Sequence, residues 1–313
     1  MTTIRDIARL ADCSVTTVSR VLNRHPYVSE VKRKQILEII DELDYVPSAQ
    51  ARDLSYGLSK NIGVLIPYAN VPYYDKIISG VLNAAFKEGY KITLLPTNYE
   101  AEKEKYYLKQ LAAKAFDGLI ITSKVISFET IQQHLKYGPI VCCEDTGDYP
   151  ISCVSFNREE SYVEVFQHFK ESGLRHIGLA VGRHQSISPS TALMLNAHKK
   201  VFGHFPEDSL VIPDCRNYEG GVKAGKLFAQ LPQLDGIFAN SDEVAAGILQ
   251  TVDLHSIKII GEENLLAGHL LHFSTVDHHL DRCGEEAFQL LFEPKNTRLS
   301  IPYRFIKREK NNS

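Results

Sequence analysis

Residues 13–23, CSVTTVSRVLN, carry hydroxyl, arginine and amide side chains at helical spacing. At about 100° per residue, Thr16, Arg20 and Asn23 lie opposite an apolar stripe that includes Val18. Arginine can bind guanine O6 and N7 with two hydrogen bonds, and threonine can reach base edges or a thymine methyl group. The stretch therefore indicates either a helix that reads bases in a DNA major groove or an ordinary solvated helical hairpin.

Helix-like stretches within residues 1–46 would hold that polar face in place. Thr3 with Asp6 resembles a capping box that opens a first helix, and Ser14 and Ser29 are good N-caps for a second and a third. Apolar residues recur at helical spacing in the third stretch as well. We therefore expect an all-α helix-turn-helix headpiece that buries one side of its second helix.

A short segment, residues 47–59, separates this headpiece from the rest of the chain. Pro47 ends the preceding helix, Ser48 is a good N-cap, and Gly57 would end the helix that Ser48 begins. An isolated helix of about two turns is marginal in water. We interpret the segment as a hinge that becomes helical only when something holds it.

From Asn61 onward, apolar strand-like runs alternate with amphipathic helix-like runs. Such alternation is typical of parallel sheets covered on both faces. Two series indicate an α/β core, residues 60–313, of two doubly wound lobes with a cleft at the carboxyl ends of the strands. The expected strands are 62–68, 91–97, 117–123, 139–144, 153–156, 176–182, 236–241 and 257–262, and the expected helices are 73–90, 102–116, 192–202 and 242–252. We expect the chain to cross between the lobes near Asn157 and Asn264, a helix over 280–292 to return to the first lobe, and 300–306 to form a final strand.

Composition limits the class of protein. The 313 residues carry a formal net charge of −3, but seven basic residues crowd the first 34. The six cysteines form no C-x-x-C pair, and no apolar run approaches the roughly 18 residues of a membrane span, so we expect a cytoplasmic protein with reduced thiols and without metal, cofactor or membrane contact. No nucleotide-binding or hydrolase motif occurs, so no enzyme activity is expected. Four histidines lie close together in the sequence. We interpret them as part of a solvated or packed loop rather than as a metal site: His269, His272, His278 and His279.

The text TIRDIARLADCSVTTVSRVLN, then VSEVKRKQILEIIDELDYVPSAQARDLS, then a two-lobe α/β body resembles the lactose/galactose repressor (LacI-type) family over nearly the whole chain. That resemblance implies a transcription regulator that binds a pseudo-palindromic double-stranded DNA operator as a homodimer. It implies a periplasmic-binding-protein-like core that an effector biases. It also implies that Leu54 of the hinge wedges into the minor groove and kinks the operator, and that DNA is contacted by Ser14, Val15, Thr16, Thr17, Arg20 and Asn23.

The same resemblance implies an effector site between the lobes, lined by Tyr73, Tyr74, Asn157, Ser190 and Asp242. Here the sequence departs from the family pattern. Sugar-binding relatives carry an arginine about where Ser190 stands, and their G-F-D turn reads GEEN at Gly261–Asn264. Serine cannot replace the two-pronged hydrogen bonding of arginine. Three alternatives stay open: a different ligand, substitution by Arg183 or His184, or no small effector.

The phrases LLPTNY, CEDTGD and ANSDEVAAGI are similar to the catabolite control branch of that family. This similarity implies repression of carbon-utilisation operons, with a sugar or phosphosugar effector or a phosphocarrier protein as co-repressor. The C-terminal tail lacks an apolar heptad run, which favours a dimer over a coiled-coil tetramer. The alternative, from another class, is a small-molecule binding protein or sugar-processing enzyme that carries a helical N-terminal domain. Deletion of residues 1–58 distinguishes the two, because only the repressor loses its function.

Overall fold

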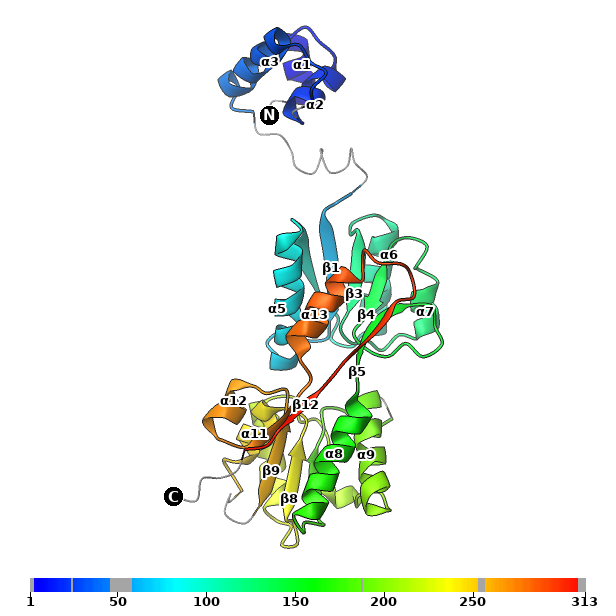
Figure 1. Ribbon diagram of the computed structural model, residues 1–313, viewed down its shortest axis with the longest axis vertical. Helices are drawn as coiled ribbons and strands as arrows, with labels where there is room; N and C mark the ends of the chain where they lie inside the picture. The colour runs from blue at the N-terminus through cyan, green and yellow to red at the C-terminus, as the bar shows by residue number, and fades with distance from the viewer. Residues whose placement is uncertain (1–2, 24, 46–57, 187, 253–256, 309–313) are drawn as a thin grey trace. The chain divides into compact units, whose positions relative to one another are not determined.

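The computed structural model describes residues 3–23, 25–45, 58–186, 188–252 and 257–308. The chain divides into two compact units, Met1–Ser59 and Lys60–Ser313 (Figure 1). Most of the predicted hinge, including Leu54, lies outside the described residues.

Three helices form the described part of the first unit: α1 (Ile4–Leu10), α2 (Val15–Leu22) and α3 (Glu30–Glu42). Each begins at its predicted cap. Thr3 and Asp6 form a reciprocal capping box, and the hydroxyls of Ser14 and Ser29 accept first-turn N–H groups at 3.1 and 3.4 Å. The predicted helix starts are therefore confirmed, because each cap satisfies an N–H that the helix itself leaves unpaired.

These helices enclose a small apolar core of Ile7, Ala8, Ala11, Val18, Val21 and Ile36. Two basic side chains of α3 reach across it to the loops around α2. Lys32 Nζ donates to the carbonyl of Ala11 at 2.7 Å, and Arg33 donates to the carbonyl of His25. Both side chains therefore hold the second helix in place within the unit.

Replacing Ser29 with alanine should destabilise the headpiece by about 1 kcal/mol, because the Lys32 N–H at the start of α3 loses its acceptor. Thermal unfolding of the headpiece, followed by circular dichroism, measures the loss. Glu42→Ala, at the exposed last turn of the same helix, is the control and should leave the midpoint nearly unchanged. Equal midpoints for the wild type and Ser29→Ala would contradict the role given to this cap.

The first lobe of the second unit is built on a six-stranded sheet with the order β11-β5-β4-β3-β1-β2, in which every described strand pair is parallel. Two apolar clusters, one on each face, explain why these strands read as continuous apolar runs. The strands are β1 (Asn61–Ile66), β2 (Lys91–Pro96), β3 (Gly118–Ile121), β4 (Ile140–Cys142), β5 (Ser152–Phe156) and β11 (Arg298–Ile301). The helices are α5 (Pro72–Lys87), α6 (Ala101–Ala112), α7 (Phe128–Gln132) and α13 (Leu280–Gln289).

The second lobe repeats this plan with the order β12-β10-β9-β8-β6-β7, in which β12 alone among the described strands runs antiparallel to its neighbour. The strands are β6 (Ile177–Ala180), β7 (Val211–Ile212), β8 (Gly236–Ala239), β9 (Lys258–Glu262), β10 (Ser274–Asp277) and β12 (Arg304–Ile306). The helices are α8 (Arg158–Glu171), α9 (Pro189–Phe202), α10 (Tyr218–Phe228), α11 (Asp242–Ile248) and α12 (Leu266–Leu270), with a 3₁₀ turn at Asp208–Leu210. The expected α/β architecture is confirmed.

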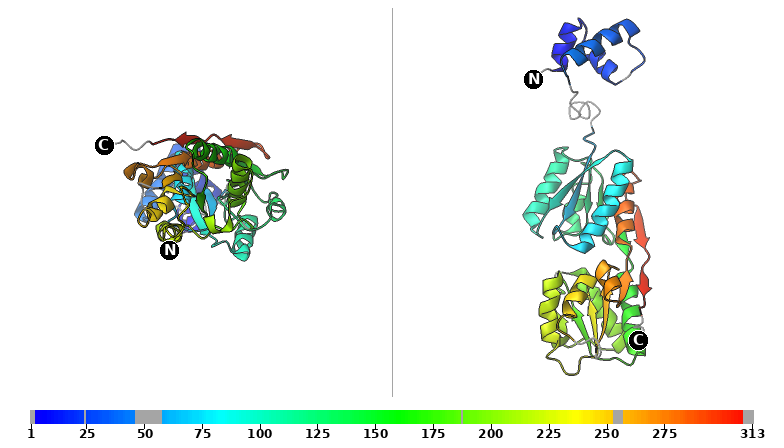
Figure 2. Two further views of the ribbon diagram at one scale, coloured as in Figure 1. Left: turned by 90° about the horizontal axis from the view of Figure 1, so that it is seen from below. Right: turned by 90° about the vertical axis from the view of Figure 1, so that its left-hand side faces the viewer.

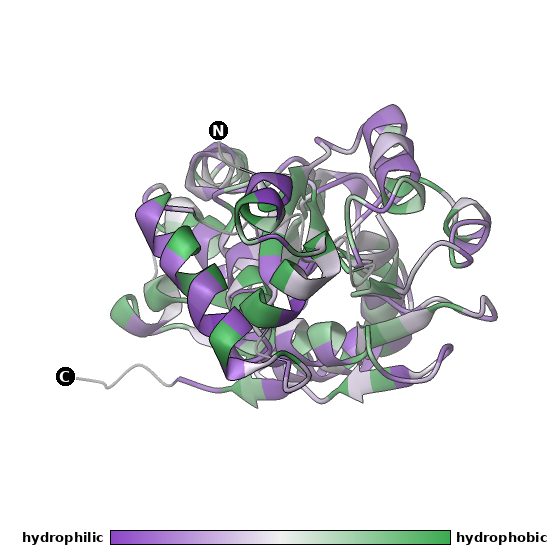
Figure 3. Ribbon diagram, turned by 90° about the horizontal axis from the view of Figure 1, so that it is seen from above, coloured by the Kyte–Doolittle hydropathy of each residue, from purple (hydrophilic) through white to green (hydrophobic). Residues whose placement is uncertain are grey.

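The helices carry hydrophobic and hydrophilic residues side by side, as amphipathic helices that cover sheets should (Figure 3). Among the described helices, none combines the length and the apolar character that crossing a lipid bilayer requires.

The chain crosses between the lobes in three places. The crossing at Asn157, between β5 and α8, is where the sequence predicted one. The second prediction, near Asn264, is wrong, because α12 and β10 still follow within the second lobe and the chain crosses at His278 and His279. The third crossing joins β11, in the sheet of the first lobe, to β12, in the sheet of the second lobe; both strands are drawn in red in Figure 2.

The prediction of one final strand over 300–306 is therefore also wrong. Pro302 lies between β11 and β12, and proline has no N–H to donate to a sheet. Pairing stops there, and the chain passes to the other lobe.

The return of the chain to the first lobe through α13 is confirmed. Helices α13 and α5 approach closely where Gly80 of α5 faces α13 and Gly284 of α13 faces α5. A Cβ at Gly80 would collide with the carbonyl of Asp281, and one at Gly284 with the carbonyl of Ile77. These contacts fix one face of α5 inside the lobe.

Candidate functional site

The second helix of the headpiece presents the predicted polar face to solvent. Val18 and Val21 are buried, whereas Thr16 and Arg20 are exposed and Val15 is 41% exposed. Among the described residues, the Arg20 side chain has no hydrogen-bond or ion-pair partner. Its guanidinium is therefore free to bind a partner outside the chain.

The other predicted DNA contacts on this helix are engaged within it. Ser14 and Thr17 pair their hydroxyls at 2.9 Å, and Asn23 Nδ2 donates to Ser19 at 3.4 Å. Ser14 therefore shapes the start of the helix. The roles of Ser14, Thr17 and Asn23 in DNA contact stay predictions.

Most other basic side chains of the headpiece already have partners. Arg9 pairs with Asp6 at 3.2 Å and Lys34 with Glu38 at 3.9 Å. Within the described part of this unit, Arg5 resembles Arg20 in having neither an ion-pair nor a hydrogen-bond partner for its side chain. Arg5 of α1 and Arg20 of α2 are thus two basic side chains that can bind an external anion without breaking a contact within the described residues.

The predicted effector residues come from both lobes. Tyr73 and Tyr74 begin α5 in the first lobe; Tyr73 accepts a hydrogen bond from Arg158 at 3.1 Å, and Tyr74 pairs with the hydroxyl of Tyr99 at 2.8 Å. Asn157 lies at the first crossing, where its side chain makes no capping hydrogen bond. In the second lobe, Ser190 pairs with Ser188 at 3.1 Å. These residues all lie near the boundary of the two lobes or at the start of a helix, but their part in ligand contact stays a prediction.

Asp242, predicted to line the effector site, lies buried at the start of α11. The residue is 0% exposed, and its two carboxylate oxygens accept the Thr275 hydroxyl at 2.6 Å and the Leu265 N–H at 2.7 Å. Gly261 and Gly268 leave room for it, because a Cβ at either glycine would overlap the carboxylate. Burial raises the pKa of Asp242 to about 7, although these hydrogen bonds lower it. In this conformation Asp242 ties α11 to β10 and to the loop after β9, with both oxygens engaged by the protein.

Three arginines of the second lobe contact tyrosines of the first. Besides the Arg158–Tyr73 contact, the Arg183 guanidinium lies 4.0 Å from the centre of the Tyr99 ring, and Arg216 donates to the Tyr68 hydroxyl at 3.1 Å. Cations over aromatic faces and charged hydrogen bonds each stabilise this arrangement of the two lobes. Sequence reasoning named Arg183 as a substitute but missed Arg158 and Arg216, because nothing local marks an arginine that pairs across a cleft.

Arg183 is the arginine of this set with unused donors. Arg216 also pairs with Asp214 at 3.0 Å, whereas the Arg183 guanidinium has no hydrogen-bond or ion-pair partner among the described residues. Nearby, Asn240 Oδ1 is buried and has no partner among them. Asn240 lies against Gly182, the residue before Arg183, since its Nδ2 would be 2.9 Å from a Cβ there. The two side chains suit a ligand that carries both a negative group and a hydroxyl.

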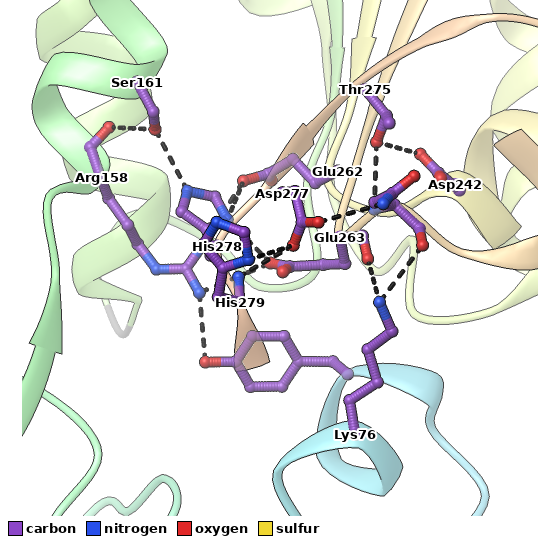
Figure 4. Close-up of polar contacts among 12 residues, drawn as sticks. Lys76, Arg158, Ser161, Asp242, Glu262, Glu263, Thr275, Asp277, His278 and His279 are labelled. Carbon is purple, nitrogen blue, oxygen red and sulfur yellow. Dashed lines mark hydrogen bonds and ion pairs between the residues drawn. The ribbon is translucent and has the colours of Figure 1, made fainter. Parts of the chain in front are cut away.

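A charged cluster occupies the place where the chain crosses between the lobes (Figure 4). Arg158 lies 3.4 Å from Glu262 and 3.6 Å from Glu263, and His278 Nδ1 lies 3.3 Å from Glu263. From α5, Lys76 donates to the backbone carbonyl of Glu263 at 2.8 Å. Burial raises the pKa of Glu262 well above its ordinary value and lowers the pKa of His278. We call Arg158, Glu262, Glu263 and His278 the crossing cluster.

Within the described part of the chain, Glu262, Glu263 and His278 are the one group whose possible metal-ligand atoms all lie within 4.8 Å of each other. Arg158 already places a positive charge on both carboxylates. His278 is thus a packed residue, as one of the sequence alternatives held for the histidine-rich loop.

A cavity of about 310 Å³ lies elsewhere in the second lobe, and none of the predicted effector residues lines it. Two basic side chains that line this cavity already hydrogen-bond to the backbone: Lys170 donates to the Val201 carbonyl and Arg175 to the Lys170 carbonyl. We therefore place the candidate effector site at the lobe boundary, where donors and acceptors are left unused.

Two family models match the chain. Residues 3–48 match bacterial regulatory proteins of the lacI family, and residues 59–309 match periplasmic binding proteins and the sugar binding domain of the LacI family. Catabolite control protein B of Bacillus subtilis (strain 168) is 41% identical over 311 residues, which cover 98% of this chain and 100% of that protein. The ribose operon repressor of Halalkalibacterium halodurans is 31% identical over 323 residues, which cover 99% and 97%.

The fold has a solved counterpart in the lac repressor dimer bound to operator and the anti-inducer ONPF. That structure gives a TM-score of 0.82 at 19% identity and covers 100% of this chain and 99% of the other. The regulator CelR in complex with cellobiose gives 0.69 at 21%, covering 99% and 100%. At these identities the likeness concerns the fold alone.

Proposed function

The chain belongs to the lacI family of bacterial regulatory proteins, and from that premise we propose that it represses carbon-utilisation operons by binding a pseudo-palindromic operator as a homodimer. The observation that carries the proposal is the exposed face of α2, where Thr16 and Arg20 lie opposite the buried Val18 and Val21, and the half-exposed Val15 lies on the flank. The Arg20 side chain has no partner among the described residues. Bidentate contact of an arginine with guanine and apolar contact with a thymine methyl group are the usual means of reading the major groove.

The dimer is proposed to form through the outer face of α5. Its inner face packs on α13, while Leu82 and Phe86, one turn apart, are 48% and 86% exposed. Large apolar side chains exposed together at helical spacing favour burial against a partner. Two copies would present two α2 helices, which an operator with two half-sites requires. Leu54 keeps its predicted role as the minor-groove wedge between them.

The link to carbon metabolism rests on the relatives. The curated relative with 41% identity is named a catabolite control protein, and a second relative is named for the ribose operon. Mapping of chromosomal binding sites in the host, with and without a preferred sugar, tests the link. Enrichment upstream of carbon-utilisation genes that rises with the preferred sugar is expected. Sites unrelated to carbon use, or occupancy that ignores the sugar, would contradict it.

The effector is proposed to be a small anionic sugar derivative, such as a phosphosugar, held between the lobes. Neither the Arg183 guanidinium nor Asn240 Oδ1 has a hydrogen-bond partner among the described residues, so Arg183 would donate to a phosphate or carboxylate and Asn240 would accept from a hydroxyl. This assignment follows one alternative that the sequence left open, the replacement of the usual arginine by Arg183. A phosphorylated phosphocarrier protein remains the proposed source of co-repression at the surface of the core.

Arg183→Ala should weaken binding of a phosphosugar about tenfold, because it removes charge-assisted hydrogen bonds. Isothermal titration of the full chain with paired sugars and phosphosugars measures the change. Arg216→Ala is the matched control, since Asp214 already pairs with that side chain, and it should cost less. Equal affinity of the wild type for a sugar and its phosphate would contradict the anionic effector.

A further inference from the structure

The crossing cluster buries more negative than positive charge. It sets two carboxyl groups, Glu262 and Glu263, against the single guanidinium of Arg158. Their side chains are 2%, 1% and 14% exposed, so water cannot screen the excess. A buried charge without a counter-charge is costly, and such sites bind whatever restores neutrality.

The groups around the cluster leave this imbalance in place. Tyr73 and Tyr162 stay neutral, since burial raises the pKa of both hydroxyls. Two cations near the cluster, Lys76 of α5 and Arg308 after β12, carry two positive charges. These balance the two negative charges of Asp242 in α11 and Asp277 in β10. With every carboxyl group ionised, the assembly therefore remains one positive charge short.

Two further contacts show where that charge belongs. Glu263 Oε2 is buried and has no partner among the described residues. The Ser161 hydroxyl donates to the Arg158 carbonyl at 2.9 Å and lies 3.2 Å from His278 Nε2. The hydroxyl has only one hydrogen, which the Arg158 carbonyl takes, so in its contact with His278 the hydroxyl accepts a hydrogen bond from Nε2–H. A neutral imidazole carries a hydrogen on one nitrogen only, so the Nδ1 that faces Glu263 is then without a hydrogen. Two acceptors face each other in the interior, so a positive species must lie between them.

A proton meets this need better than a metal ion. One proton makes the assembly neutral, whereas a divalent ion would leave a buried positive excess beside Arg158. Burial raises the pKa of Glu262 well above its ordinary value, whereas His278 and Arg158 outweigh burial and hold the pKa of Glu263 below its ordinary value. Groups this close titrate together, so the proton belongs to the cluster rather than to one atom.

The position of the cluster gives that proton a consequence for the lobes. Arg158 follows the first crossing and also binds Tyr73 of the first lobe, while His278 forms the second crossing. We propose that folding of the core takes up one proton at the crossing cluster, and that loss of this proton weakens the contacts between the two lobes. In the unfolded chain water surrounds the carboxylates, and they ionise at no cost. The proposal goes beyond the proposed function and does not depend on DNA or on an effector.

The direction of the pH effect follows from linkage. In the unfolded chain glutamate titrates at about 4.3 and histidine at about 6.5, so well above pH 7 these groups bind almost no proton there, while the folded core binds one. Stability therefore falls as the pH rises, by about tenfold in the unfolding equilibrium constant per pH unit, until the core also loses its proton. Asp242, with a pKa of about 7, titrates largely below this window.

Thermal unfolding of the full chain from about pH 7.5 to 9 tests the proposal through Glu262→Gln, which removes one carboxylate charge from the cluster. The midpoint of both proteins should fall with pH, because buried thiols such as Cys142, Cys143 and Cys215 keep their protons in the fold. The wild-type midpoint should fall more steeply, by the share of the cluster proton. Glu159→Gln is the matched control, because Glu159 lies next to Arg158 but is half exposed and pairs with Lys200. It should follow the wild type.

A Glu262→Gln midpoint that falls in parallel with the wild type would overturn the proposal. So would a rise with added Zn²⁺ in the wild type alone, which would assign the missing charge to a metal ion. Should Glu262→Gln fail to fold, Glu263→Gln removes the same charge and carries the same test. Nitrogen-15 shifts of His278 in the wild type need no variant: a protonated Nε2 is expected, and a bare Nε2 would remove the basis of the proposal.

Discussion

Arg20→Ala is expected to weaken operator binding about 10- to 100-fold and to relax the preference for one base in each half-site. The side chain is exposed on α2 and has no partner among the described residues, so binding a guanine breaks no contact within the protein. Alanine loses both hydrogen bonds to that base, while contacts to phosphates remain. Fluorescence anisotropy at one stated salt concentration, on operators that vary the contacted base, measures both effects.

Lys34→Ala removes the same charge from the same unit and serves as the control. Lys34 is 80% exposed on α3 and pairs with Glu38. Its loss should weaken binding to all operators alike and leave the base preference unchanged. If Arg20→Ala behaves in the same way, Arg20 contacts only phosphates, and its role in reading bases is wrong.

Phe86→Asp is expected to dissociate the homodimer and to lower operator affinity more than about 100-fold. An aspartate in the proposed α5 interface would be buried without a counter-charge. A monomer binds one half-site at a time. It therefore lacks the higher affinity that a dimer gains when its two linked headpieces bind both half-sites together. Analytical ultracentrifugation gives the oligomeric state, and anisotropy on the full operator gives the affinity.

Phe205→Asp provides the comparison for this change. Phe205 is exposed as well, but it follows α9 in the second lobe, where it contacts Lys199. This variant should remain dimeric with unchanged affinity. A dimeric Phe86→Asp would move the interface away from the outer face of α5.

The headpiece was predictable from sequence because its signals are local. Each cap lies within three residues of the N–H it accepts, as for Ser14 and Ser29, and the apolar spacing of α2 fixes which side is buried. Most strands of the core were predicted as well, because burial on both faces makes strands such as β1, β3, β6 and β8 continuous apolar runs. The strands β7 and β10 were missed. Helix α8 was missed, since its exposed Glu159 and Glu160 give its first turn the polarity of a loop.

The positions where the chain changes lobe were harder to predict. Sequence reasoning placed the second crossing near Asn264, but α12 and β10 come first and the chain crosses at His278. It also joined β11 and β12 into one strand, although Pro302 separates them. Which sheet a strand joins depends on pairing across long stretches of sequence, and no local pattern specifies that.

The polar contacts between the lobes could not be predicted from local sequence patterns either, because they join residues that are far apart in the chain. Arg158 and Glu262 are 104 residues apart, and Tyr68 and Arg216 are 148 apart. The burial of Asp242 was equally hidden from local reasoning, because two glycines distant in sequence, Gly261 and Gly268, make room for its carboxylate.

Base reading by α2 can be tested by selecting binding sites from a random DNA pool with the purified full-length protein, at a physiological salt concentration, and sequencing them. We expect a pseudo-palindromic motif whose half-sites lose one base preference when Arg20→Ala is used instead. Salt-sensitive binding that enriches no motif, with or without a phosphorylated phosphocarrier protein, would contradict a base-reading role for α2.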